Sequence, residues 1–164
     1  MSPTSSAPVN TPKQNLKASF ILFLSIVIGI FIFMIVAILV GQTRGPLVPK
    51  LNQYHTAIAI GMAIVSFGCL FLARQQYAKG IEAAKKSLNP LNEKLNMHRN
   101  ALIRYLFICE VPVFLSIITY MFNGNFIFQI YVAIFIGFML TVMPTRTKVT
   151  EDLRLGSQER QELG

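Results

Sequence analysis

Four apolar segments, each of roughly 20 residues, constrain the fold of this chain more than any other feature. An α-helix needs about 20 apolar residues to cross the hydrocarbon core of a bilayer, which is roughly 30 Å thick. The predicted spans cover about residues 19–41, 55–73, 101–122 and 126–143. Backbone groups exposed to lipid must be satisfied within their own segment, which favours helices over open sheets. We therefore predict an all-α fold with a four-helix transmembrane bundle over residues 19–143.

The composition agrees with a location in a membrane. Only 13% of the residues are charged, whereas soluble domains average about 25%, and the chain contains 13 Phe. The first apolar segment is longer than the roughly 7–15 apolar residues of a signal peptide, and no small-residue cleavage pattern follows it. We interpret it as an uncleaved span.

The polar stretches between and around the spans predict the remaining architecture. Residues 1–18 are rich in Ser, Thr, Pro and Asn and are predicted to be a disordered arm. Residues 74–100 are predicted to extend the second and third spans as a cytosolic helical hairpin. The Asn-Pro pair at 89–90 breaks this hairpin, because the residue before a proline avoids the α region. Residues 122–125 predict a tight turn, and residues 144–164 a polar tail with only a brief amphipathic turn.

The distribution of positive charge predicts the orientation. An even number of spans places the arm, the hairpin and the tail on one side of the membrane. These segments and the adjoining helix edges carry all but two of the 15 Lys and Arg, while Arg44 and Lys50 lie on the other side. Because cytosolic segments are enriched in Lys and Arg, we predict that both termini are cytosolic, in a cell membrane such as the bacterial inner membrane. The net charge of +8 then reflects topology and does not indicate a nucleic-acid partner.

Glu110 is the only acidic residue within the four apolar segments. A carboxylate at this depth must be paired, hydrated or neutralised, which makes it a functional hypothesis by default. No Lys or Arg is predicted at its depth, so we expect a protonated, neutral carboxyl group. Pro112 lies two residues further on and frees the carbonyl of Ile108, which predicts a kink beside the acid.

Three more polar side chains complete a candidate intramembrane site with Glu110 and Pro112. Ser66 and Tyr131 are predicted at a similar depth in the second and fourth spans, and Gln129 in the outer third of the fourth. A freed carbonyl beside a protonatable acid is typical of an ion or proton site. The same residues can instead fix helix packing by hydrogen bonds or contact a partner protein.

Small residues recur at helical spacing in the second span. Ala57 and Gly61 are four residues apart, as are Ala59 and Ala63. Small side chains allow helix backbones to approach closely where no hydrophobic effect drives association. We therefore predict that this face packs against another helix.

The sequence offers little for catalysis or metal binding. Cys69 and Cys109 fall within apolar segments, His98 is expected at the surface of the hairpin, and there is no CxxC pair. There is also no phosphate-binding loop, nucleophile elbow or zinc motif. We predict no enzymatic activity, cofactor, metal or nucleic-acid partner. The expected partners are the lipid bilayer and either a second copy or a larger membrane protein.

Three short motifs in the final third of the chain carry a resemblance to known proteins. They are E-V-P-V-F at 110–114, N-G-N at 123–125 and P-T-R-T-K-V-T-E-D-L at 144–153. Together they resemble a group of small uncharacterised bacterial four-helix membrane proteins. The resemblance implies a four-span fold and no particular activity.

Two functional hypotheses of different class follow. The preferred one is a non-enzymatic structural or interaction subunit of the membrane. The alternative is a small proton- or cation-coupled transporter that uses Glu110. A carboxylate in the middle of a membrane helix is similar to that of rotary-ATPase ring subunits and small multidrug exporters. However, the ring subunits are richer in Gly and Ala, and the exporters usually carry their acid in the first span.

Overall fold

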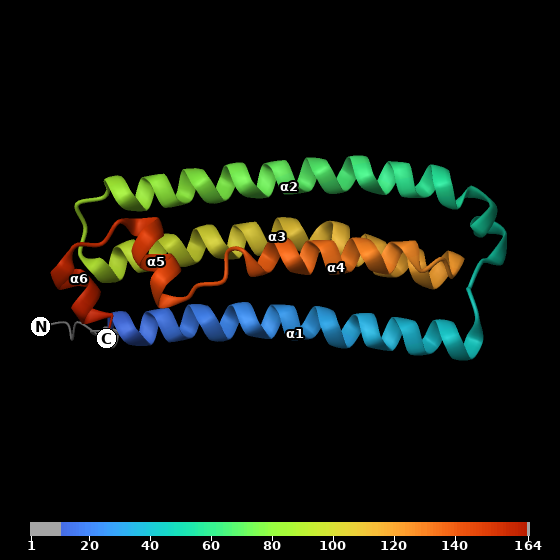
Figure 1. The fold of residues 1–164 in the computed structure, drawn as a ribbon, viewed down its shortest axis with the longest axis horizontal. Helices are drawn as coiled ribbons and strands as arrows, with labels where there is room; N and C mark the ends of the chain where they lie inside the picture. The colour runs from blue at the N-terminus through green and yellow to red at the C-terminus, as the bar shows by residue number, and fades with distance from the viewer. Residues whose placement is uncertain (1–10, 164) are drawn as a thin grey trace, which may run out of the picture.

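The computed structural model describes residues 11–163, and this range consists of helices and their connections without a strand. The all-α prediction is therefore confirmed for the described residues. The elements in chain order are α1 (Pro12–Arg44), η1 (Pro49–Tyr54), α2 (His55–Lys86), α3 (Leu91–Asn123), α4 (Ile127–Leu140), α5 (Arg146–Leu153) and α6 (Ser157–Glu162). Helices α1 to α4 run alongside one another, and α5 and α6 lie at the end of the bundle where α1 begins (Figure 1).

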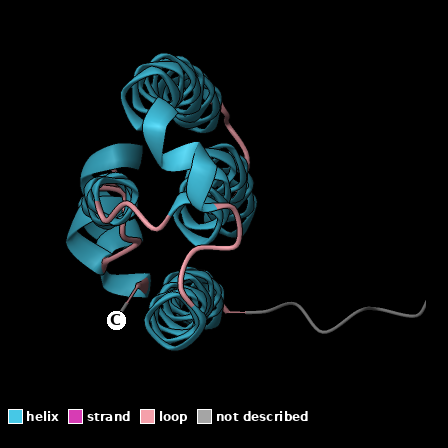
Figure 2. Cartoon of the chain, turned by 90° about the vertical axis from the view of Figure 1, so that its right-hand side faces the viewer, coloured by secondary structure: helices cyan, strands magenta, loops and turns pink. Residues whose placement is uncertain are grey.

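Helix α3 occupies the centre of the bundle and packs against α1, α2 and α4. The view along the bundle shows α1 and α2 on opposite sides of the α3–α4 pair (Figure 2). Half of the most apolar part of α3 is buried, whereas the corresponding parts of α1 and α2 are mostly exposed. Large side chains such as Ile64 and Phe71 are therefore mostly exposed, as expected where lipid replaces water around a helix.

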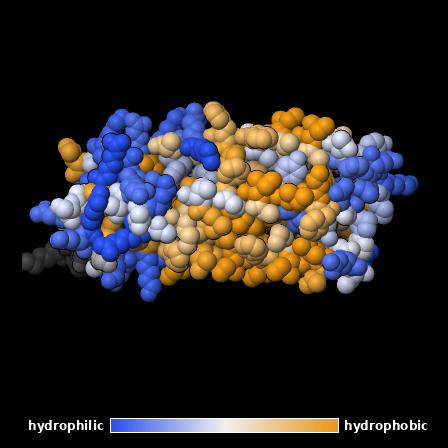
Figure 3. Space-filling model, viewed as in Figure 1, coloured by the Kyte–Doolittle hydropathy of each residue, from blue (hydrophilic) through white to orange (hydrophobic). Residues whose placement is uncertain are grey.

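Within residues 11–163, three helices are long and apolar enough to cross a membrane, namely α1, α2 together with η1, and α3. Figure 3 shows the result as an apolar belt across the middle of the molecule with hydrophilic residues at both ends. Helix α4 is also apolar, but its 14 residues extend only about 21 Å at 1.5 Å per residue.

The predicted fourth span, residues 126–143, is thus too long for a single helix. The helix ends at Leu140, and residues 141–143 form tighter turns in which each N–H bonds a carbonyl three residues back. Thr141 reinforces this ending, because its hydroxyl donates to the Phe138 carbonyl at 2.7 Å. Pro144 then follows, and a proline has no N–H with which to continue a helix.

Helix α1 begins at Pro12, inside the segment predicted to be disordered, so the predicted boundary at residue 18 is wrong. Thr11 caps the helix: its hydroxyl accepts from the Gln14 N–H, and the Gln14 side chain accepts from the Thr11 N–H. This capping box, followed by a proline at the first helical position, starts a helix before the apolar run. The start of α1 is also tied to α3, because Arg99 donates to the Asn15 side chain at 3.2 Å. Residues 1–10 of the predicted arm lie outside the described residues.

Helices extend beyond the predicted second and third spans as expected, and the cytosolic location of this hairpin stays a prediction. Helix α2 continues past the predicted second span to Lys86, and α3 begins at Leu91. The break between them contains the predicted Asn-Pro pair at 89–90.

The two helices of the hairpin approach closely at Gly80, where an added Cβ would lie 2.6 Å from the Cβ of Ala101. Small residues therefore mediate helix contact here, and of the predicted pairs Ala59 packs against the core, where its carbonyl accepts from Tyr131 on α4. Ala57 and Gly61 are exposed, and a Cβ on Gly61 would meet no described atom within 4 Å.

The C-terminal tail is more ordered than predicted. Instead of one brief turn it forms α5 and α6, and α5 packs against α2 and α3. This packing creates a second apolar core, separate from that of the bundle, which contains Ala84, Leu91, Leu95, Val149, Leu153, Leu155 and Leu163. Thr145 caps α5 by accepting from the Lys148 N–H at 3.2 Å. We call this unit, residues 74–100 with α5 and α6, the head.

The Gly80 contact gives a prediction about stability. Gly80→Ala should destabilise the folded protein by about 1–3 kcal/mol, because the new methyl group collides with the backbone-anchored Cβ of Ala101. The matched control is Gly68→Ala on the same helix, where nothing lies within 4 Å and the effect should be small or stabilising. Thermal unfolding of both variants in detergent checks this. Equal unfolding temperatures for the two variants would contradict the close contact.

Candidate functional site

The predicted intramembrane residues do not converge on Glu110. Its side chain is half-buried in the middle of α3, and no hydrogen bond or ion pair joins it to another described residue. Pro112, two residues further along α3, is buried. The helix continues through it to Asn123 without a break.

The other three predicted residues, Tyr131, Ser66 and Gln129, do not contact Glu110 through a hydrogen bond. The Tyr131 hydroxyl donates to the Ala59 carbonyl at 3.2 Å and so joins α4 to α2. The Ser66 hydroxyl is buried without a partner, and so are both side-chain amide atoms of Gln129. An unsatisfied buried polar group costs about 1–3 kcal/mol, so these positions are suited to a bound water or a group from another molecule.

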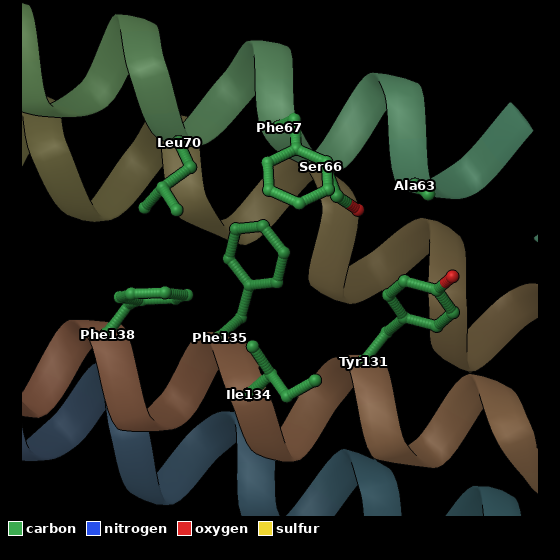
Figure 4. Close-up of a pocket in the computed structure, with 8 residues that line it drawn as sticks. All are labelled: Ala63, Ser66, Phe67, Leu70, Tyr131, Ile134, Phe135 and Phe138. Atoms are coloured by element: carbon green, nitrogen blue, oxygen red, sulfur yellow. The ribbon is translucent and has the colours of Figure 1, made fainter. Parts of the chain in front are cut away.

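Ser66 and Tyr131 meet at a cavity of about 200 Å³ between α2 and α4. Figure 4 shows its lining, which comes from one face of each helix and is aliphatic and aromatic. The lining residues are Ala63, Ser66, Phe67 and Leu70 on α2, and Tyr131, Ile134, Phe135 and Phe138 on α4. Glu110 is not among them, so the carboxylate and the cavity are separate features.

Polar side chains converge instead in the head, where three helices meet. The Tyr77 hydroxyl on α2 donates to Asp152 Oδ2 on α5 at 2.7 Å. His98 Nε2 on α3 lies 3.4 Å from the same oxygen, and Lys148 Nζ lies 3.0 Å from Asp152 Oδ1. We call these four side chains the tail latch.

His98 shows what the sequence reasoning missed. It was predicted at the surface, but it is only 2% exposed, because α5 covers it. The available signal was its spacing: Leu95 and Leu102 lie three and four residues away on the same face of the helix, and both are buried. Tyr77 and Asp152 gave no comparable signal, since their contact joins positions 75 residues apart.

The latch stabilises a charged carboxylate. Burial alone would raise the pKa of Asp152, but the hydrogen bonds from His98, Tyr77 and Lys148 outweigh it and lower the pKa to about 2. Tyr77 lies beyond the spanning part of α2, and burial followed by the contact with Asp152 raises its pKa well above the usual range. Tyr77 therefore remains a proton donor and Asp152 an anionic acceptor at neutral pH.

A carboxylate beside a histidine also occurs in hydrolases, where it orients the general base. In the described chain, however, no Ser, Thr or Cys side chain hydrogen-bonds to His98, and its ring is almost completely covered. The geometry suits a structural clamp that holds α5 on the hairpin. A second ion pair, Lys94 Nζ to Glu159 Oε1 at 2.9 Å, holds α6 in the same way.

The described residues contain no group of three or more His, Cys, Asp or Glu arranged to hold a metal ion. Cys69 and Cys109 are free thiols. Comparisons with protein-family models, with curated proteins and with solved structures found no match to this chain. The resemblance to small bacterial membrane proteins therefore stays a prediction, and the function has to be argued from the geometry.

The latch predicts an acid-dependent release of α5. Because the pKa of Asp152 is lowered in the folded state, its stabilisation is complete above the ordinary value of 3.8 and is lost as the pH falls toward about 2. The protection of the α5 amides, measured as the ratio of the exchange rate of an unstructured peptide to the observed rate at the same pH, should fall over this interval in the wild type. Asp152→Asn should raise exchange by roughly 10- to 150-fold already at neutral pH, since a hydrogen bond to a charged group contributes about 1.5–3 kcal/mol.

The matched control is Glu151→Gln, which removes the same charge from an exposed neighbouring position on α5. It should leave exchange at neutral pH unchanged and retain the acid-induced step. An acid-induced step of the same size in Asp152→Asn would show that other groups cause the release.

Proposed function

We propose that this chain is a four-span integral membrane protein without catalytic activity of its own, which acts as a structural or interaction subunit. The observation that carries this proposal is the tail latch, which folds the C-terminal tail onto the α2–α3 hairpin as a compact head outside the apolar belt. A preordered surface of this kind loses little conformational entropy when a partner binds. The polar side chains that contact one another, those of the tail latch, hold the protein's own helices together.

The four-span arrangement is supported by the course of the chain. Helix α4 starts at the end of the bundle that carries η1 and leads toward the end that carries α5 (Figure 1). The turns at residues 141–143 lengthen its path beyond the helix itself. Both ends of the described chain then lie at one end of the molecule (Figure 1). The excess of Lys and Arg at this end favours the cytosolic side of a cell membrane.

The partner is a second copy or a larger membrane protein, and two features favour such contacts within the bilayer. The outer faces of α1 and α2 are exposed along most of their apolar length. Glu110 is half-buried without a described partner, and polar side chains at this depth commonly hydrogen-bond to a neighbouring helix.

The orientation is tested by reporter fusions. A reporter enzyme that is active only outside the cytosol should be inactive when fused after Gly164 and active when inserted next to Lys50 in η1. Helix α6 and η1 lie at opposite ends of the bundle (Figure 1), so each fusion acts as the control of the other. Activity of the fusion at Gly164 would overturn the proposed orientation.

The alternative function, a proton- or cation-coupled transporter, is favoured by one observation, the unpartnered state of Glu110 in the described chain. The two functions diverge for Glu110→Gln, which preserves size and hydrogen bonding but removes protonation. For an interaction subunit we expect no proton flux above that of empty vesicles for wild type or variant. We also expect association with the partner on native gels of solubilised membranes to be unchanged in Glu110→Gln and several-fold weaker in Glu110→Leu, which removes the hydrogen-bonding group.

The control for association is Thr119→Val, which removes a hydroxyl on the same helix that bonds only within the helix, to the Leu115 carbonyl. It should leave the size of the native complex unchanged. Coupled flux in the wild type that disappears in Glu110→Gln would establish the transporter and reject the subunit proposal.

A further inference from the structure

The cavity between α2 and α4, which we call the α2–α4 groove, lies within the apolar belt of the molecule. Each of the two helices packs on α3, and the space between them is about 200 Å³. Its lining residues belong to the predicted second and fourth spans and include no charged side chain (Figure 4). At this depth a protein surface meets hydrocarbon chains, so an apolar occupant fits the groove without any cost of burying charge.

A cationic side chain lies at one end of the groove. Arg74 follows Leu70 by four residues on α2, or about 6 Å along the helix axis toward the head. Its guanidinium carbon lies 5.4 Å from the ring centroid of Phe138, and this ring lines the groove. The cation–π contact holds the charge next to the apolar lining.

Arg74 is available to a further ligand. The side chain is exposed, and within the described chain no carboxylate forms an ion pair with it. It also lies at the boundary between the apolar belt and the head, because Tyr77 of the tail latch is less than one turn further along α2. This is the level at which a phospholipid places its phosphate. A guanidinium group binds phosphate through two parallel hydrogen bonds.

We propose that the α2–α4 groove binds an anionic phospholipid, with an acyl chain along the groove and the phosphate against Arg74. Charge complementarity selects this occupant, since among the described residues the only charge at the apolar groove is that of Arg74, which is positive and has no carboxylate partner. A helix from a second copy is about 10–12 Å across with its side chains and does not fit a space of this volume. Basic positions between membrane helices on the cytosolic side are known to attract anionic headgroups.

The proposal rests on the membrane insertion and orientation proposed above, and it is tested with the full-length protein. The protein is extracted from membranes in mild detergent and offered equal amounts of phosphatidylglycerol and phosphatidylcholine with the same acyl chains. Native mass spectrometry counts the lipids that stay bound. We expect the wild type to retain phosphatidylglycerol over phosphatidylcholine by about fivefold, the preference that one basic residue near the surface confers.

Two variants separate the headgroup contact from the groove. Arg74→Gln should abolish the preference, while Arg74→Lys should keep part of it. Ala63→Phe places a ring in the groove and should lower the retention of both lipids. The matched control is Arg104→Gln on α3, which removes an exposed charge. Arg104 lies at a depth similar to that of Arg74, because both are close to Phe138: the Tyr105 hydroxyl, next to Arg104, donates to the Phe138 carbonyl at 3.2 Å. It should leave the preference unchanged.

Three outcomes would overturn the proposal. If the wild type retains both lipids equally, the ligand is not anionic. If Arg74→Gln and Arg104→Gln lower the preference for phosphatidylglycerol equally, the preference comes from the overall charge at this end of the molecule. A dimer that Ala63→Phe dissociates without loss of lipid shows that protein covers the groove. If alkaline carbonate extracts the protein from membranes, the membrane insertion itself is refuted. This result distinguishes a failure of the proposed membrane insertion from a failure of the proposed lipid site.

Discussion

The burial of α3 by helices on three sides is the constraint on which the rest of the structure depends. Helices α1, α2 and α4 each pack on α3, while α1 and α2 lie apart on opposite sides of it. In lipid no hydrophobic effect draws helices together, so close packing and hydrogen bonds must hold them. The hydrogen bond from Tyr105 to the Phe138 carbonyl supplies this between α3 and α4, and the one from Tyr131 to the Ala59 carbonyl supplies it between α4 and α2.

The same arrangement explains why the sequence predicted the long apolar helices better than the candidate site. Span positions follow from hydropathy and length, because the thickness of the bilayer fixes how many apolar residues a helix needs. Depth along a helix, however, does not specify the direction in which a side chain points. Glu110, Ser66 and Tyr131 were matched by depth alone, and only Ser66 and Tyr131 line a common cavity. Glu110 faces elsewhere on α3.

The tail was underestimated for a different reason. The tail has few buried residues, and charged residues separate them: Val149, Leu153 and Leu155. No continuous apolar run therefore predicts a helix there. They become a core only because the hairpin offers Leu91 and Leu95 as a complementary surface. Such packing between segments far apart in sequence cannot be inferred from local periodicity, and the ion pair from Lys94 to Glu159 depends on it in turn.

The tail latch and the α2–α4 groove are linked through α2, which runs without a break from His55 to Lys86. Arg74, at the end of the groove, and Tyr77, in the latch, are three residues apart on this helix. A rotation of α2 about its axis would therefore move both side chains together, since a helix transmits rotation as a rigid element within one turn. Holding Tyr77 against Asp152 also fixes the direction in which Arg74 is presented at the edge of the apolar belt. The contact that orders the head thus positions the one unpaired cation beside the groove.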